Sequence, residues 1–89
     1  MVSIAISLVA CWQPGGEPLE WEQADAYGRW SLRRARVDLA CHMHEMSVTR
    51  GERGYHVEGC GRQATYGCGG WTLYGQNPCE RRGEVSALP

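Results

Sequence analysis

Hydrophobic residues recur at helical spacing from residue 21 to residue 39 and at strand spacing from residue 46 to residue 68. In the first stretch, apolar or small residues stand three or four positions apart and therefore share one side of a helix: Trp21, Ala24, Gly28, Leu32, Ala35 and Leu39. Pro18 suits the first turn of a helix, so we expect the helix to begin there. Gly28 costs about 1 kcal/mol relative to alanine inside a helix, which makes a break near Tyr27 and Gly28 compatible with the pattern.

The charged residues of this stretch are ordered as a helix dipole favours. Acidic residues stand near its start, at positions 20, 22 and 25, and arginines stand near its end, at positions 33, 34 and 36. Four arginines lie between residues 29 and 36 with Trp30 among them, a composition that also occurs in patches that bind nucleic acid or lipid headgroups. Because no aromatic stacking platform accompanies these arginines, we interpret them as a solvated helix face.

After Cys41 the apolar residues alternate with polar neighbours, which is the period of a strand. Met46 and Val48 form one such stretch, and Tyr55 and Val57 form the next. The run between them, Arg-Gly-Glu-Arg-Gly, has the residues of a turn. This pattern predicts a β-hairpin.

A third strand is predicted where Ala64, Tyr66 and Cys68 share one face. The run Gly59-Cys60-Gly61 before it interrupts the alternation, and glycines at such a place commonly mark a bulge or a close approach of two backbones. Residues 71–74 predict a short fourth strand, and residues 81–89 are expected to form a frayed tail.

The order of these elements predicts an α+β fold, in which one N-terminal helix packs on a small three- to four-stranded antiparallel sheet. The expected core consists of large residues from both layers: Trp21, Leu32, Leu39, Val48, Tyr55, Val57, Tyr66 and Leu73. Phenylalanine is absent from the chain, so tryptophan and tyrosine supply the aromatic part of this core. Their polar tips need hydrogen-bond partners or water.

Residues 2–10 are apolar apart from two serines and are too short to cross a bilayer as a helix. They end in Leu8-Val9-Ala10-Cys11, which resembles the lipobox of bacterial lipoproteins, where the cysteine is acylated and becomes the mature N-terminus. We therefore interpret residues 1–10 as a signal-like segment and Cys11 as the site of lipid attachment. No arginine or lysine precedes the apolar run, in contrast to a signal peptide. A first strand and an amphipathic start of a soluble domain are the alternatives.

Residues 11–18 contain two prolines and two glycines, a composition typical of a tether. We predict that residues 19–80 form a single disulfide-stabilised domain and that residues 81–89 form a flexible tail. The tether would suit a domain held near a membrane by a lipid.

The remaining cysteines, Cys41, Cys60, Cys68 and Cys79, predict two disulfides. A domain of this size gains only about 3–5 kcal/mol of net stability from a single core, and disulfides add roughly 2–4 kcal/mol each in an oxidising compartment. Four cysteines allow three pairings, among which sequence alone does not choose. We prefer Cys41 with Cys60, which would join the helix end to the strand interruption, and Cys68 with Cys79, which would close the last hairpin.

A zinc site is the alternative use of the same sulfur atoms. The run Cys41-His42-Met43-His44 holds three potential ligands, and a cytosolic structural zinc module would draw on Cys41, His44, Cys60, Cys68 and Cys79. However, no two cysteines have the short gap found in zinc knuckles and ribbons. We therefore expect neither a metal nor another cofactor.

Two stretches carry a resemblance to known proteins: Ala-Arg-Val-Asp-Leu-Ala-Cys at 35–41, and Tyr-His-Val-Glu-Gly-Cys-Gly-Arg-Gln-Ala-Thr-Tyr-Gly-Cys at 55–68. They resemble a group of small uncharacterised bacterial lipoproteins and secreted proteins with A-x-x-D-L-x-C, Y-x-V-x-G-C-G-x-x-A-x-Y-x-C and a last cysteine near the end. The match covers residues 35–80. It implies an envelope protein and gives no catalytic residue to carry over. His42 stands where the group often has proline, which puts a potential ligand beside Cys41.

The sequence favours a protein that is not an enzyme. A cysteine nucleophile needs a base nearby, and Cys60 with His56 or Cys41 with His42 would be the dyads, although neighbouring cysteines compete as partners. C-x-x-C redox, phosphate-loop, nucleophile-elbow and metalloprotease motifs are absent. Single carboxylates such as Asp38 are interpreted as solvated side chains.

The net charge of −1 gives no strong field toward nucleic acid or an anionic membrane, and we do not expect nucleic acid as a partner. We predict a small non-enzymatic protein of the bacterial cell envelope, anchored in the membrane through Cys11 or secreted. The sequence does not identify a protein or small-molecule partner. Exposed aromatic and arginine side chains such as Trp30, Trp71 and Arg62 would contact one.

Overall fold

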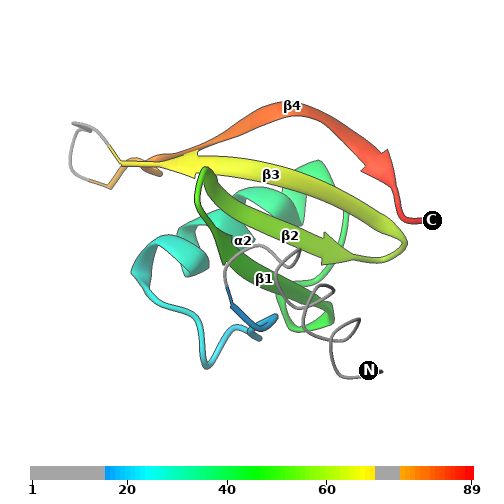
Figure 1. Cartoon of the computed structure of the whole chain (residues 1–89), viewed down its shortest axis with the longest axis horizontal. Coiled ribbons are helices and arrows are strands. Elements are labelled where there is room, and N and C mark those ends of the chain that lie inside the picture. The colour runs from blue at the N-terminus through cyan, green and yellow to red at the C-terminus, as the bar shows by residue number, and fades with distance from the viewer. Residues whose placement is uncertain (1–15, 70–74) are drawn as a thin grey trace, which may run out of the picture.

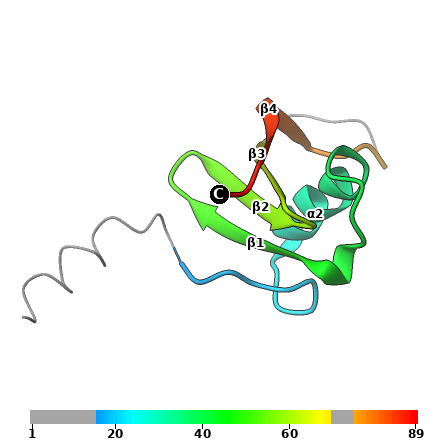
Figure 2. The same cartoon turned by 90° about the vertical axis from the view of Figure 1, so that its right-hand side faces the viewer.

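The computed structural model describes residues 16–69 and 75–89. The elements are helix α2 (Ala26–Asp38), the short 3-10 helix η1 (Met43–Glu45) and strands β1 (Met46–Gly51), β2 (Gly54–Gly59), β3 (Arg62–Cys68) and β4 (Cys79–Ala87). The strands form one antiparallel sheet in the order β1-β2-β3-β4, and α2 lies against one of its faces (Figures 1 and 2). This arrangement confirms the predicted α+β, disulfide-stapled fold.

Helix α2 begins at Ala26, eight residues later than the start predicted at Pro18. Asp25 is extended and its side chain accepts a hydrogen bond from the Gly28 amide at 2.7 Å, so it is the N-cap. Upstream, Leu19 and Val48 exchange two backbone hydrogen bonds of 2.8 and 2.9 Å. These bonds hold the chain beside β1 at Leu19, and a turn at residues 21–23 leads from there to the helix.

The sequence allowed a break of the helix at Gly28, but the helix is continuous there. Gly28 lies in the first turn, where the helix approaches neighbouring side chains closely. A Cβ at this position would lie 3.1 Å from the Ala24 side chain and 3.5 Å from that of Val48. The helix ends at Asp38, and two residues later Ala40 has a positive φ of 50°. The Cys41 amide donates a 3.2 Å hydrogen bond to the Arg36 carbonyl. This closing turn is a Schellman motif.

The first predicted hairpin is confirmed, with Val48 of β1 opposite Val57 of β2. Between β2 and β3 the chain reverses in two residues, Cys60 at φ 52 and Gly61 at φ 75, so the predicted bulge there is a tight turn. The predicted close backbone approach occurs at Gly59, where a Cβ would lie 3.0 Å from the Glu45 carbonyl oxygen and 3.1 Å from the Met46 Cα.

The tail predicted at residues 81–89 is wrong, because most of it belongs to β4. This strand pairs with β3 from Cys68 opposite Cys79 to Arg62 opposite Ala87, with one irregularity in register. Most β4 side chains are exposed, and Leu88 adds a backbone hydrogen bond of 2.9 Å to Gly61. Because backbone pairing holds this strand, its side chains need not alternate between apolar and polar. The sequence pattern that predicted the other strands is therefore absent here.

The core lies between α2 and the sheet. Most of the predicted core residues are buried: Leu32, Leu39, Val48, Tyr55, Val57 and Tyr66. Trp21 is half-buried and packs against them, while Leu73 lies outside the described residues, as does the strand predicted at 71–74. Within residues 16–69 and 75–89, no helix has the length and apolar character needed to cross a membrane.

Candidate functional site

The first disulfide joins Cys41 to Cys60, with 5.8 Å between the two Cα atoms. Cys41 follows the closing turn of α2 and is buried, whereas Cys60 is exposed at the turn between β2 and β3. The bond therefore fastens the end of the helix layer to the sheet, as the preferred pairing predicted.

The second disulfide joins Cys68 to Cys79, which stand directly opposite each other on β3 and β4 with Cα atoms 4.0 Å apart. The buried hydroxyl of Ser31 on α2 lies 3.2 Å from the Cys68 sulfur and 3.5 Å from that of Cys79. It also donates a 3.0 Å hydrogen bond to the Tyr27 carbonyl. This bridge closes the β3–β4 hairpin beneath the helix.

The residues of the alternative zinc site fall into separate places. In the described part of the chain, the group with metal-ligating atoms within 4.8 Å of one another is Cys41, Glu45 and Cys60. Its two sulfur atoms are bonded to each other, so neither is a free thiolate ligand. Cys68 and Cys79 lie in the other bridge and are not part of this group.

The two histidines after α2 form a small exposed cluster beside the first bridge. The rings of His42 and His44 stack with centroids 5.2 Å apart, and the His42 ring accepts a 3.2 Å hydrogen bond from the His44 amide. His44 Nδ1 lies 3.7 Å from the Glu22 carboxylate. A carboxylate oxygen of Glu45 lies 3.6 Å from the Cys60 sulfur.

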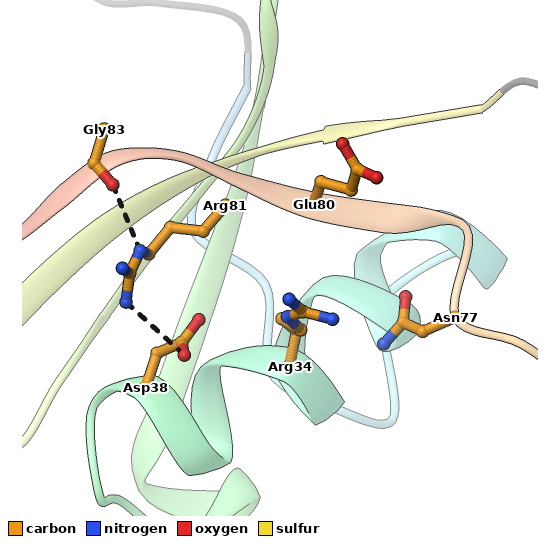
Figure 3. A pocket seen from close by; sticks show the side chains of 6 residues that line it. All are labelled: Arg34, Asp38, Asn77, Glu80, Arg81 and Gly83. Atoms are coloured by element: carbon orange, nitrogen blue, oxygen red, sulfur yellow. Dashed lines mark hydrogen bonds and ion pairs between the residues drawn. The ribbon is translucent and has the colours of Figure 1, made fainter.

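A polar cleft of about 370 Å³ lies between α2 and β4 and is lined by Arg34, Asp38, Asn77, Glu80, Arg81 and Gly83. Figure 3 shows Asp38 and Arg81 pointing toward each other across it, and their charged atoms are 3.5 Å apart. Arg81 also donates a 3.0 Å hydrogen bond to the Gly83 carbonyl. Asp38, expected to be a solvated carboxylate, therefore holds β4 to the helix.

Two tyrosines of the sheet donate hydrogen bonds to carboxylates at the two ends of α2. Tyr55 donates to Asp25 at 3.0 Å, and Tyr66 donates to Asp38 at 2.8 Å. Burial raises the pKa of both phenols above the ordinary value, and the hydrogen bonds to the carboxylates raise these pKa values further. The sequence predicted that buried tyrosine hydroxyls need hydrogen-bond partners, and both hydroxyls have one.

A second cleft, of about 380 Å³, lies at the turn between β1 and β2 and carries net positive charge. Its charged lining consists of Arg50, Arg53 and Arg82 against one carboxylate, that of Glu52. A Cβ at Gly67 would overlap the Arg82 guanidinium, so glycine leaves room for that group. This cleft would favour an anion over a cation, although its charged groups are exposed to water and screened by salt.

An aromatic platform lies beside the helix arginines, contrary to the expectation from the sequence that none accompanies them. The Arg33 guanidinium lies 5.5 Å from the Trp21 ring centroid and 4.9 Å from that of Trp30. Arg29 lies 5.2 Å from the Trp21 ring and donates a 2.9 Å hydrogen bond to the Trp21 carbonyl. The missed signal was Asp25, since an N-cap there places Trp21 outside the helix and frees it to fold back.

The other predicted binding residues are not gathered into one site. Trp30 is half-buried on α2, Arg62 is exposed at the start of β3, and Trp71 lies outside the described residues, as does Cys11. The predicted catalytic dyads do not assemble either. The sulfurs of Cys41 and Cys60 are bonded together, while the His56 ring contacts Thr65 and Glu58 at 3.2 Å each.

No family model, curated protein or solved structure matches this chain. The resemblance to small bacterial lipoproteins and secreted proteins therefore stays a prediction.

Proposed function

We propose that this protein is a small non-enzymatic module of the bacterial cell envelope, anchored in the membrane through a lipid on Cys11. The observation that carries the proposal is the pair of disulfides, Cys41–Cys60 and Cys68–Cys79. Such bonds persist in oxidising compartments outside the cytosol and are rare inside it. A cysteine that follows Leu-Val-Ala is the group that the envelope machinery would acylate.

The order of segments along the chain also supports the proposal. The described part begins with Gly16, Glu17 and Pro18, all exposed, and Leu19 makes the bridge to β1. A packed domain that starts here would leave residues 11–18 to link it to an acylated Cys11. Their proline and glycine content suits such a linker.

The non-enzymatic part of the proposal is supported by how the reactive groups of the described residues are engaged. All four cysteine sulfurs of the domain are in disulfides, which removes the thiolate that a nucleophile requires. In the cleft beside β4, Asp38 is bound to Tyr66 and Arg81. These groups stabilise the fold.

The mass of the intact protein, recovered from its natural host, tests the proposal. We expect a mature chain that begins at an acylated Cys11 and lacks four hydrogen atoms, two for each disulfide. A chain that retains residues 1–10 without a lipid would contradict the anchor. Free thiols at the four domain cysteines would contradict the envelope location.

A structural zinc module is the second candidate, favoured by the grouping of Cys41, Glu45 and Cys60. Protein made under reducing conditions should then bind zinc near one ion per chain, with thiols that do not react with alkylating reagents. We expect instead little bound zinc and reactive thiols. The same preparation, oxidised, should lose its thiols and regain the two bridges.

A further inference from the structure

The outward side of α2 differs in composition from the rest of the protein surface. Four small or apolar residues on its inward side are buried against the sheet: Gly28, Ser31, Leu32 and Ala35. Trp30, Arg33 and Val37 lie on the opposite side at helical spacing. The large hydrophobic side chains that are exposed in residues 16–69 and 75–89 are Tyr27, at 43%, and Val37, at 79%, and both belong to this helix.

The same side is positively charged although the whole chain has a net charge of −1. Residues 26–37 include four arginines and no acidic residue, and all four arginines are exposed. The carboxylates at the two ends, Asp25 and Asp38, face the sheet and accept hydrogen bonds from its tyrosines. Glu80 shares the cleft beside Arg34, and on the other flank Arg29 donates a hydrogen bond to the Glu22 carbonyl, while the Glu22 carboxylate lies 3.7 Å from His44.

Both tryptophans contact Arg33 through their rings. The central carbon of its guanidinium lies over the Trp21 and Trp30 rings, 5.5 and 4.9 Å from their centroids, a contact that uses no hydrogen bond. Within the described residues, neither Arg33 nor Arg36 donates a hydrogen bond or forms an ion pair. The N–H groups of both side chains are thus available to an anion such as phosphate, which guanidinium groups bind in bidentate fashion.

From these observations we propose that the outward side of α2 docks on the headgroups of an anionic phospholipid membrane. Arginines would bind the phosphates, while the tryptophan rings and Val37 would enter the interfacial layer, where aromatic and aliphatic groups are favoured. A linear polyanion such as nucleic acid or an acidic polysaccharide would match the charges but would leave Val37 in water.

This proposal rests on the lipid anchor of the proposed function, which it extends. An acyl chain together with a basic patch holds a protein at a membrane more firmly than one signal alone. Residues 11–18 span at most about 30 Å when fully extended, so a lipid on Cys11 would keep the domain near the bilayer surface. The helix face would then set which side of the domain meets the membrane.

Vesicle binding tests the docking face without the lipid. The full chain with Cys11→Ser is mixed with vesicles of neutral phosphatidylcholine, or of phosphatidylcholine containing phosphatidylglycerol, and the bound fraction is measured by sedimentation. We expect binding to the anionic vesicles and little to the neutral ones, decreasing as salt is raised. Free glycerophosphate in excess should compete poorly, since it lacks the interface that Val37 and the aromatic rings would enter.

Matched variants separate the helix face from general charge. In the Cys11→Ser background, Arg33→Gln with Arg36→Gln should lower partitioning on the order of tenfold or more. Arg50→Gln with Arg53→Gln removes the same charge from the β1–β2 turn and should leave partitioning within about twofold. Val37→Ser should weaken binding to anionic vesicles at high salt, where the electrostatic part is screened. Circular dichroism confirms that each variant is folded.

Equal losses in the two double-arginine variants would overturn the docking face, because net charge would then explain the binding. The docking face would also be overturned if the protein did not bind anionic vesicles, or if it bound only an acidic polysaccharide or nucleic acid added in their place. These results are independent of the lipid on Cys11, which the mass of the native protein reports. Failure of the anchor and failure of the docking face are therefore distinguishable.

Discussion

The hydroxyls of Tyr55 and Tyr66 show how single polar atoms fix the orientation of α2 on the sheet. Tyr55 on β2 donates to the N-cap Asp25, and Tyr66 on β3 donates to Asp38 in the last turn. Each carboxylate thus has a sheet partner, and the helix is held at both ends. Tyr66 is fully buried, so loss of its hydrogen bond would remove a partner from a carboxylate that is only 17% exposed.

Replacement of Tyr66 by phenylalanine should lower the free energy of unfolding by roughly 1–3 kcal/mol, because the Asp38 carboxylate loses a donor in a partly buried site. Denaturant unfolding at neutral pH measures this. Tyr27→Phe is the matched control, since Tyr27 is 43% exposed, and it should change stability by less than about 0.5 kcal/mol. Equal effects in the two variants would contradict the role given to Tyr66.

The raised tyrosine pKa values also predict how stability depends on alkaline pH. In the unfolded chain a phenol titrates near its ordinary pKa of 10.0, whereas burial keeps Tyr55 and Tyr66 protonated to higher pH in the fold. The stabilisation is fully present below pH 10.0 and is lost as pH rises from there toward the folded pKa values. Tyr66→Phe should make this alkaline loss smaller, and denaturant unfolding over a pH series would show it. An unchanged slope would contradict the assignment.

At the scale of elements, β4 shows a strand that depends on its backbone. Its burial pattern has one buried residue, Cys79, and one half-buried residue, Val85, so side-chain packing contributes little along most of its length. It is joined instead by the ladder to β3, by the Cys68–Cys79 bond and by the ion pair of Arg81 with Asp38. These contacts also cover the edge of β3 that would otherwise be open.

Deletion of residues 81–89 should therefore destabilise the whole domain. The deletion leaves the backbone groups of β3 unpaired along one edge and removes Arg81, the ion-pair partner of Asp38. We expect a lower thermal midpoint and less cooperative unfolding by circular dichroism. Deletion of Pro89 alone, which follows the strand, should have little effect. A truncated chain as stable as the full one would mean that these residues behave as a tail after all.

At the scale of the whole molecule, the two disulfides connect all the layers of the fold. Cys41–Cys60 joins the end of the helix layer to the β2–β3 turn across 19 positions, and Cys68–Cys79 joins β3 to β4 across 11. Loops of this length correspond to about 3 kcal/mol of stabilisation each through restriction of the unfolded chain. Because a core of this size gives only a few kcal/mol, the bridges supply a large share of the stability.

Reduction of both bridges should thus lower the thermal midpoint sharply and loosen α2 from the sheet, and an unchanged midpoint would contradict this. With limiting reductant, we expect Cys41 and Cys60 to react first, because Cys60 is exposed while Cys79 is buried beside Ser31. Alkylation followed by peptide mass analysis identifies the order. Earlier modification of Cys68 and Cys79 would show that the second bridge is the more accessible one.

The sequence was sufficient where one local pattern decides one structure. The alternation around Val48 and Val57 determined the hairpin, and burial of the same side chains in the core followed from it. The preferred cysteine pairing also agreed with the fold, because it joined elements whose order was already clear. The predicted helix start was wrong because the apolar spacing around Trp21 continues upstream of Asp25. The capping hydrogen bond of Asp25 decides where the helix begins.

By itself, then, the sequence determined the two layers, most of the core and the candidate sulfur chemistry, because each depends on the period or the type of neighbouring residues. Tertiary structure alone decided that β4 forms and that Asp38 pairs with Tyr66 and Arg81. It also decided that the Trp21 ring contacts the Arg33 guanidinium. Each of these depends on contacts between segments far apart in the chain or on backbone pairing that side-chain patterns do not encode. The arginine-bearing helix face became a candidate docking surface for the same reason.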